Sequence, residues 1–328
     1  MAKYEEANAS PATKDVVLAF VNLDRSTSRQ NTFGIPSGLG TLLGIKSGRN
    51  YNVRNIAAYL GPNNEYPDRR DKFLWGNNGL SGASILSGGI YVSLPSVPAT
   101  DSAWGSAPFE AQYLKVYDVT APPAVTGTPT IQPAYSVPSS PTTYTADGTT
   151  RVNWNAVTDP EGLSPVYQVT ARNGSGAVVS TTETTSTSAS VAGLPAGGNY
   201  TFTVTAVNPN DTSKAATASV SSAPVVALNP SADDDGDGMS NAAELVAGTN
   251  PMSASSNFVA STSRPSANSV TVTWTPVSGR TYKVQATDNL ASGGWINLAT
   301  GQTSGSYTEN SVSSSARFYR IVVETNSP

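Results

Sequence analysis

Cysteine and histidine are absent from this 328-residue chain. Without cysteine there is no disulfide and no thiol nucleophile, and without histidine there is no imidazole metal ligand and no catalytic triad that uses histidine as its base. The sequence therefore excludes zinc sites with imidazole ligands and every histidine-dependent hydrolase. The lack of cysteine does not argue against export, because many bacterial extracellular proteins have no disulfides.

Charged residues are scarce as well, at 13% of the chain, and the net charge is −4 with a pI near 4.9. No basic surface is expected to attract nucleic acid or an anionic membrane, so we expect neutral or cationic partners. The sequence has no run of about 18 apolar residues, and we therefore expect no membrane span. Residues 1–12 contain no apolar segment of a signal peptide. We expect that an export signal was removed or that the chain is an internal piece of a longer protein.

Glycine and proline are frequent, with 28 and 23 residues, and serine and threonine dominate the polar residues. This composition favours short β-strands joined by turns over a helical enzyme, and the length favours two or three domains. We predict an all-β chain of three tandem β-sandwiches over residues 1–120, 121–227 and 257–328. A calcium-binding loop with one short helix is predicted between the last two sandwiches, at residues 228–256.

The clearest chemical pattern is the acidic segment at residues 231–251, SADDDGDGMSNAAELVAGTNP. Its spacing is that of an EF-hand calcium loop, in which alternate side chains converge on one ion and a glycine at position 6 permits the sharp turn. Gly238 occupies position 6 when Asp233 is position 1. The predicted Ca²⁺ ligands are the carboxylates at positions 1, 3, 5 and 12, the backbone carbonyl at position 7 and a water held at position 9: Asp233, Asp235, Asp237, Glu244, Met239 and Asn241.

A solvated Asp/Gly linker without an ion is the alternative interpretation of this segment. The glutamate at position 12 favours calcium, because a random acidic linker has no reason to place one there. Asn241–Ala247 is predicted to be a helix that Gly248 caps and Pro251 ends, whereas residues 228–230 leave no room for an incoming helix. The segment resembles the calcium repeats of dockerins and thrombospondin type 3 segments, which implies a structural joint between domains of a secreted bacterial protein.

The first predicted sandwich contains four segments with strand-like patterns, at residues 15–23, 51–59, 90–94 and 111–119. The runs DVVLAFVNLDRSTSRQNTFGIP, YNVRNIAAYLG, DKFLWG and APFEAQYLKVYDV resemble the C-terminal β-sandwich that follows the catalytic barrel in α-amylase-family glycoside hydrolases and maltosyltransferases. This resemblance implies a non-catalytic accessory domain, with the catalytic barrel before Met1. It also implies an α-glucan, or the upstream catalytic domain itself, as the partner.

Aromatic residues in the loops of the first sandwich are candidates for sugar binding, because an exposed ring can stack on the apolar face of a pyranose. These candidates are Tyr66, Trp75 and Trp104. The alternative is that such rings cover the rim of their own sandwich or pack on the barrel that the resemblance implies. Catalysis by this sandwich itself is a further alternative, since several acidic residues are present there: Glu65, Asp68, Asp71, Asp101 and Glu110.

Two further sandwiches are predicted from strand patterns. Residues 121–150 are predicted to be a stiff Pro/Ser/Thr-rich linker that runs into a first strand. RVNWNAV, the strand at residues 166–171 and a late strand pair in LPAGGNYTFTVTAVN resemble a fibronectin type III domain, with Trp154 in the core and the hydroxyl of Tyr200 bonded to upstream backbone. SVTVTW, TYKVQAT, GWINLAT and ARFYRIVVE resemble C-terminal β modules of secreted bacterial proteins, with Trp274 and Tyr282 in the core.

From these patterns we predict a non-catalytic accessory or targeting region of a secreted bacterial carbohydrate-active enzyme, in which Ca²⁺ is a structural clamp. The alternative from another class is a structural or adhesive protein of the cell surface, in which the same sandwiches act as spacers and the chain self-associates.

Overall fold

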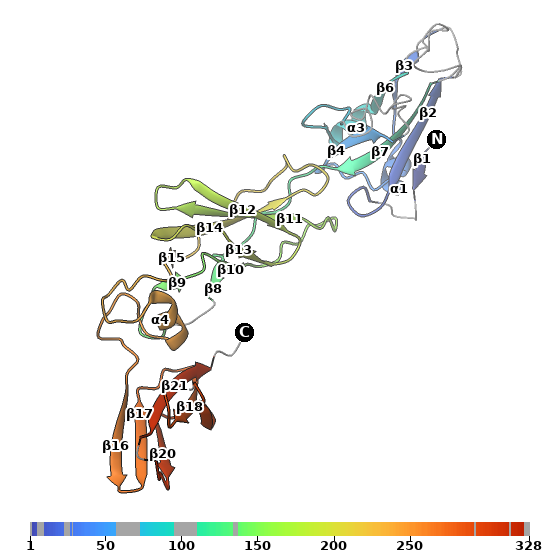
Figure 1. Cartoon of the computed structure of the whole chain (residues 1–328). Helices are drawn as coiled ribbons and strands as arrows, with labels where there is room; N and C mark the ends of the chain where they lie inside the picture. Colours follow the sequence, from blue (N-terminus) through green and yellow to red (C-terminus); the bar gives the residue numbers. More distant parts are fainter. Residues whose placement is uncertain are drawn as a thin grey trace, which may run out of the picture. The chain divides into compact units, whose positions relative to one another are not determined.

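A computed structural model describes residues 2–4, 10–22, 27, 29–56, 73–94, 110–133, 137–291, 293–314 and 316–324 (Figure 1). By their internal contacts the residues fall into two compact units. The first comprises Met1–Thr126, Ala156–Tyr167 and Thr205–Ala218, and the second comprises Gly127–Asn155, Gln168–Val204 and Ser219–Pro328. The protein is 41% strand and 7% helix, so the predicted all-β fold class is confirmed.

The first sandwich is built on an antiparallel sheet with the strand order β1-β2-β7-β4-β5, beside a two-stranded ribbon of β3 and β6. The strands predicted from the sequence correspond to β2, β4, β6 and β7. The elements of this sandwich are β1 (Ala2–Tyr4), β2 (Val16–Asn22), β3 (Arg29–Phe33), α1 (Ser37–Leu42), β4 (Asn50–Asn55), β5 (Leu80–Ser81), α3 (Gly82–Gly88), β6 (Ile90–Leu94) and β7 (Glu110–Asp118).

The core of this sandwich follows from the period-two alternation of its central strands. Val16 of β2, Val116 of β7 and Val53 of β4 lie opposite one another in register, and all three are buried. Successive side chains of a strand point to opposite faces of the sheet, so these three valines form an apolar row on the inner face. Tyr51 continues the row and is 1% exposed, with its hydroxyl accepting a hydrogen bond from the Lys46 N–H at 2.9 Å.

An ion-pair network lies within the first unit. The Arg49 guanidinium donates from Nε to Asp118 Oδ2 at 2.7 Å and from Nη1 to Asp159 Oδ2 at 2.8 Å. Asp118 ends β7, whereas Asp159 lies in the loop between β10 (Thr150–Asn153) and β11 (Val166–Asn173). Both carboxylates are buried, and Asn208 Nδ2 adds hydrogen bonds to the backbone carbonyls of Asp118 and Thr120. Buried charges of this kind require a partner, because their desolvation is costly.

The middle sandwich has two sheets, with strand orders β13-β10-β8 and β12-β11-β14-β15-β9. The predicted tyrosine contact is confirmed, since Tyr200 Oη donates to the Pro195 carbonyl at 2.7 Å. Trp154 is 8% exposed and belongs to the core, as predicted. The strands are β8 (Thr130–Gln132), β9 (Thr143–Thr145), β10 (Thr150–Asn153), β11 (Val166–Asn173), β12 (Val178–Thr184), β13 (Ser188–Val191), β14 (Gly198–Val207) and β15 (Val225–Ala227).

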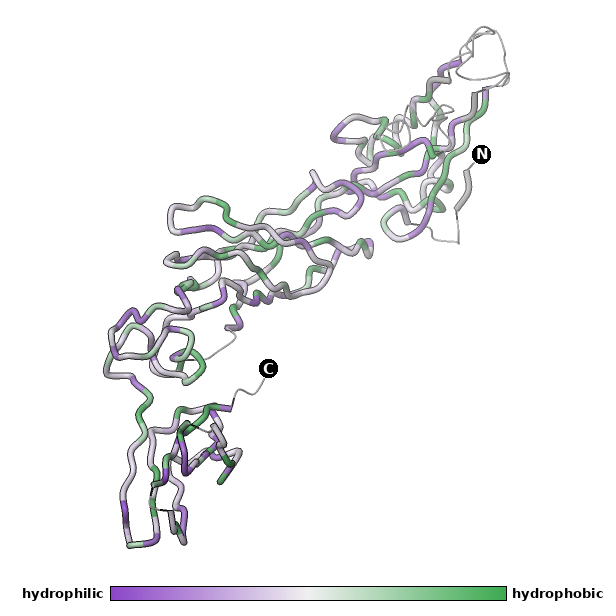
Figure 2. The backbone as a smooth tube through the Cα atoms, in the orientation of Figure 1, coloured by the Kyte–Doolittle hydropathy of each residue, from purple (hydrophilic) through white to green (hydrophobic). Residues whose placement is uncertain are grey.

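Two sequence predictions for the middle sandwich are corrected. The run LPAGGNYTFTVTAVN forms one ten-residue strand, β14, and not a strand pair, because its only turn residues precede Gly198. The Pro/Ser/Thr-rich segment is not a linker throughout, since β8 pairs with β10 and β9 pairs in parallel with β15. Figure 2 shows hydrophilic and hydrophobic residues alternating along the strands, as expected for sheets that cover a core with one face.

The C-terminal sandwich packs a sheet β16-β17-β20 against a sheet β19-β18-β21. Its core contains Trp274, Tyr282 and Val284, which confirms the prediction for the two aromatic residues. The ring of Tyr282 stacks on Phe258 with 5.7 Å between centroids and meets Trp274 edge-on at 5.6 Å. The strands are β16 (Ala260–Ser266), β17 (Ser269–Trp274), β18 (Thr281–Thr287), β19 (Ile296–Gln302), β20 (Ser306–Asn310) and β21 (Phe318–Glu324).

Candidate metal centre

The acidic segment forms a loop that leads from β15 into a single helix, α4 (Asn241–Ala247). The helix begins at Ser240, whose hydroxyl accepts the Ala243 N–H at 3.4 Å, and the Asn241 N–H donates to the Ala232 carbonyl at 2.7 Å. It ends at Gly248, which has a φ of 84° and donates its N–H to the Glu244 carbonyl. The predicted helix and its cap are confirmed. Residues 228–240 contain no helix, so the loop has one helix and not the pair of an EF-hand.

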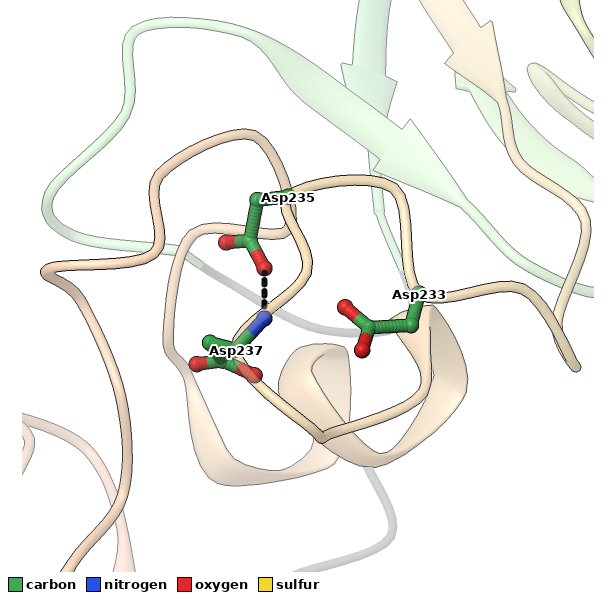
Figure 3. Close-up of side chains that lie close together, drawn as sticks. All are labelled: Asp233, Asp235 and Asp237. Atoms are coloured by element: carbon green, nitrogen blue, oxygen red, sulfur yellow. Dashed lines mark hydrogen bonds between the residues drawn. The ribbon is translucent and has the colours of Figure 1, made fainter.

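Asp233, Asp235 and Asp237 are brought together by this loop, with a carboxylate oxygen from each within 4.8 Å of the others (Figure 3). Each aspartate also folds the loop by accepting backbone N–H groups two to five residues ahead. The donors to Asp233 are Gly236 at 2.8 Å and Gly238 at 2.9 Å, while Asp237 donates to Asp235 Oδ1 at 3.1 Å and Met239 donates to Asp237 Oδ1 at 2.8 Å.

Gly238 has a φ of 95°, a conformation that residues with a side chain rarely adopt. This is the physical reason for a glycine at position 6 of the calcium pattern. The turn that it permits lets the chain reverse its direction sharply, as a calcium loop requires.

Three carboxylate oxygens in this loop are buried without a hydrogen-bond donor: Asp235 Oδ2, Asp237 Oδ2 and Glu244 Oε2. Buried polar atoms in folded proteins are nearly always paired, and an unpaired anionic oxygen is especially costly. Hard cations such as Ca²⁺ take their ligands from carboxylate and carbonyl oxygens. The donor set and the burial of these three atoms therefore fit a calcium ion.

The electrostatics of Glu244 lead to the same conclusion. Its side chain is fully buried on α4, and burial raises its pKa to about 7, with further contributions from the charges of Asp235 and Asp237. Thr249 Oγ1 lies 3.4 Å from Glu244 Oε1. A bound cation would offset the repulsion among these carboxylates and would keep Glu244 ionised.

Asn241 makes hydrogen bonds on both sides of its side-chain amide. Its Nδ2 donates to the Asn229 carbonyl and to Asp234 Oδ2, both at 2.9 Å, and its Oδ1 accepts the Asp234 N–H at 3.3 Å. Both ends of the amide are thus engaged with protein atoms. These contacts hold the loop closed, and the role of Asn241 in holding a metal-bound water stays a prediction. The ligand role of the Met239 carbonyl stays a prediction.

Helix α4 is anchored by an apolar contact. Leu245 is 2% exposed and belongs to a core cluster with Val137, Tyr144 and Leu228. Figure 1 shows α4 beside β9, the strand that contains Tyr144. A mostly apolar hollow of about 370 Å³ opens next to this contact. The metal loop and the apolar anchor therefore share one helix, with Glu244 and Leu245 adjacent in sequence.

Of the three aromatic residues predicted to bind carbohydrate, the structure describes one. Trp75 is partly buried against the first core, as in the alternative in which the ring covers the rim of its own sandwich. Its backbone N–H donates to Asn52 Oδ1 at 3.1 Å. Tyr66 and Trp104 lie outside the described residues, as do four acidic residues of the catalytic alternative: Glu65, Asp68, Asp71 and Asp101. Glu110 begins β7, and only its backbone is described.

Two protein families match parts of the chain. Residues 233–254 match the bacterial TSP3 repeat, and residues 144–216 match the PBP1-like, fibronectin3-like domain. TSP3 repeats are a calcium-binding type of repeat. Both matches confirm resemblances read from the sequence, to thrombospondin type 3 and to fibronectin type III. The α-amylase-family origin of the first sandwich is not shown by these comparisons and stays a prediction.

No curated protein sequence matches the chain. Among solved structures, the chicken CNTN1 FN1–FN3 domains align over 98% of this chain and 91% of theirs at 10% identity, with a TM-score of 0.32. A two-domain fibronectin type III segment of chicken tenascin aligns over 57% and 95% at 19% identity, with a TM-score of 0.20. The twitchin kinase region of C. elegans aligns over 33% of this chain at 19% identity, with a TM-score of 0.25, and the match spans only 17% of that region.

Fibronectin type III-like domains and TSP3 repeats are typical of extracellular proteins. Within the described part of the chain, no helix is long and apolar enough to cross a membrane. Taken together, the matched domains suggest an extracellular accessory or structural region that contains a calcium-binding type of repeat.

Proposed function

We propose that this chain is a non-catalytic spacer or support region of a secreted bacterial protein, in which Ca²⁺ bound by the loop at residues 233–244 is a structural clamp. The observation that carries the proposal is the set of three buried carboxylate oxygens without donors, on Asp235, Asp237 and Glu244. When bound, the ion supplies positive charge to these oxygens. The residues of the chain fold the loop, bury Glu244 and anchor α4.

The contacts of α4 support a clamp and not a sensor. Calcium sensors open one helix against another and expose an apolar groove. Here the loop has one helix, and Leu245 on that helix is already buried against Tyr144. Binding of the ion would therefore fix an existing contact and would not expose a new surface.

Limited proteolysis tests the clamp. A glutamyl endopeptidase that needs no metal cleaves after Glu and, more slowly, after Asp, so residues 233–244 offer it several sites. In calcium we expect this loop to be protected, and in excess EGTA we expect early cleavage at Glu244 or at the aspartates, identified by the masses of two large fragments. Equal cleavage of the loop in both conditions would contradict the proposal.

A more specific candidate function is support of an α-glucan-active enzyme. It is favoured by one observation: the segments that resemble the α-amylase-family sandwich include β2, β7 and β4, which are adjacent strands of one antiparallel sheet. Affinity electrophoresis in gels with starch, glycogen or pullulan tests binding by the first sandwich. We expect retardation by at least one α-glucan, and unchanged mobility in every gel would count against a glucan-binding role.

A structural or adhesive role on the cell surface remains the alternative, and the same clamp would serve it. Calcium-dependent self-association, measured by sedimentation velocity, is the outcome that would favour it over the accessory role. A monomer of unchanged sedimentation coefficient with and without calcium would remove that support.

A further inference from the structure

Arg280 of the C-terminal sandwich caps the helix that contains Glu244. Its Nε donates to the Val246 carbonyl at 2.7 Å, and its Nη2 donates to the Leu245 carbonyl at 2.9 Å. Arg280 itself closes a turn just before β18, where its N–H donates to the Val277 carbonyl at 3.1 Å. One guanidinium thus joins the last turn of α4 to the turn that leads into β18 of the C-terminal core.

The carbonyl groups at the C-terminal end of α4 require hydrogen-bond donors from outside the helix. The last carbonyls of an α-helix have no partner within the helix, and together they make its C-terminus electronegative. Within α4 itself, the carbonyl of Glu244 is satisfied by the N–H groups of Gly248 and Thr249. The next two carbonyls, of Leu245 and Val246, are the ones that Arg280 binds. A cation with two directed donors suits this position better than a point charge.

The turn at residues 277–280 is also in close contact with the helix cap. A Cβ built on Gly248 would lie 2.7 Å from Val277 Cγ1 and 3.3 Å from Arg280 Nη2. Real Cβ atoms essentially never come within 3.0 Å of another heavy atom. The sandwich therefore rests on the cap at a place where glycine is required both by its φ of 84° and by the space available.

We propose that Arg280 is a positioning residue that couples calcium binding to the stability of the C-terminal sandwich. This inference rests on the proposed calcium site. Glu244 holds the ion only when α4 is formed, and the carbonyls of Leu245 and Val246 lie where Arg280 can bind them only when α4 is formed. The two events share one seven-residue helix. Coupling between sites is reciprocal, so the ion stabilises the sandwich and Arg280 strengthens binding of the ion.

Calorimetric titration with calcium chloride tests one direction of the coupling. We expect Arg280→Gln to bind the ion about tenfold more weakly than the natural chain, which lies within the usual range of coupling between sites. Arg280→Lys, which keeps the charge but loses the paired donors, should lie between the two. Arg264→Gln is the matched control. Arg264 is exposed on β16, and its substitution removes the same charge from the same sandwich.

Hydrogen exchange measured by mass spectrometry tests the other direction and requires no variant. In the natural chain, calcium should slow exchange in peptides from β17 and β18, which lie outside the metal loop. In Arg280→Gln the loop should still be slowed at saturating calcium, but β17 and β18 should respond much less.

The outcomes separate the two proposals. If the natural chain takes up no calcium, the metal site itself is wrong. If it binds calcium but exchange in β17 and β18 is unchanged, the coupling is overturned while the site stands. Equal calcium affinities for the natural chain and Arg280→Gln would also overturn the coupling. If Arg280→Gln fails to fold, hydrogen exchange of the natural chain with and without calcium still tests whether calcium binding and the C-terminal sandwich are coupled.

Discussion

Asp235 and Asp237 are joined by a hydrogen bond from the Asp237 N–H to Asp235 Oδ1 at 3.1 Å, while the second oxygen of each carboxylate is buried without a donor. One oxygen of each residue thus shapes the loop, and the other is left without a partner, as is Glu244 Oε2 on the helix that follows. Unpaired anionic oxygens are costly in a folded protein unless a cation satisfies them. This division of roles favours a metal site over an acidic turn that binds no ion.

Leu245→Ala should separate the anchor of α4 from its metal ligands. Truncation of a buried leucine leaves a cavity and typically costs about 2–5 kcal/mol of the free energy of unfolding. We expect a loss in this range for the unit that contains α4, measured by urea unfolding with saturating calcium. Leu290→Ala is the control, because Leu290 is 57% exposed and the same truncation there should change stability little. Equal losses in the two variants would show that Leu245 is not an anchor.

Arg49→Met should strongly destabilise the first unit. The substitution leaves Asp118 and Asp159 buried without their cation, and removal of one partner of a buried ion pair costs about 3–5 kcal/mol. Urea unfolding measures the loss. Adding Asp159→Asn should recover part of it, because one uncompensated charge is removed. Purely additive effects of the two substitutions would contradict the network.

Tyr200→Phe should weaken the middle sandwich by about 1 kcal/mol, the usual net value of a hydrogen bond in a folded protein. The lost bond is the one from Tyr200 Oη to the Pro195 carbonyl, and the ring itself stays in the core. Tyr91→Phe, at an exposed tyrosine, provides the comparison in thermal unfolding. If Tyr200→Phe melts at as high a temperature as Tyr91→Phe, the Tyr200 hydroxyl does not stabilise the sandwich.

Alkaline pH should destabilise the first sandwich through Tyr51. Burial raises the pKa of this hydroxyl from 10.0 to about 12, so the folded state retains a proton that the unfolded state loses. This contribution is fully present below pH 10 and is lost as the pH rises through 12. At about 1.4 kcal/mol per pH unit, it amounts to about 3 kcal/mol. In Tyr51→Phe the free energy of unfolding should fall less between pH 10 and 12, and an identical pH profile would contradict the assignment.

Much of the candidate site could be predicted from the sequence because its ligands lie within twelve residues. The spacing of Asp233, Asp235, Asp237 and Glu244 carries the chemistry, and Gly248 marks the end of α4 without any tertiary information. The continuous apolar run of β2 and the alternating patterns of β7, β11 and β18 are local in the same way. A strand with one buried face can be predicted from the alternation of apolar and polar residues in its sequence.

Other features could not be predicted because they depend on distant partners or on exposed strands. Arg49 lies 69 and 110 residues from its two carboxylates, and Arg280 lies 34 residues from the Val246 carbonyl. β16 was not predicted at all, because every residue of ASTSRPS is exposed and the pattern contains a proline. Among the strands that the structure describes, it pairs with β17 alone and forms an edge strand, with a register shift between Ser263 and Ser266.

Calcium titration of the natural chain and of Glu244→Gln, followed by calorimetry and by thermal unfolding of the same samples, tests the central claim most directly. We expect one ion per chain, and with free calcium about a hundredfold above Kd we expect the free energy of unfolding to rise by about 2.7 kcal/mol. Glu244→Gln, which removes one charge without changing the size of the side chain, should lose most of the heat of binding and most of this stabilisation. A natural chain that melts identically in calcium and in excess EGTA, or a Glu244→Gln variant that binds calcium as tightly as the natural chain, would contradict the account.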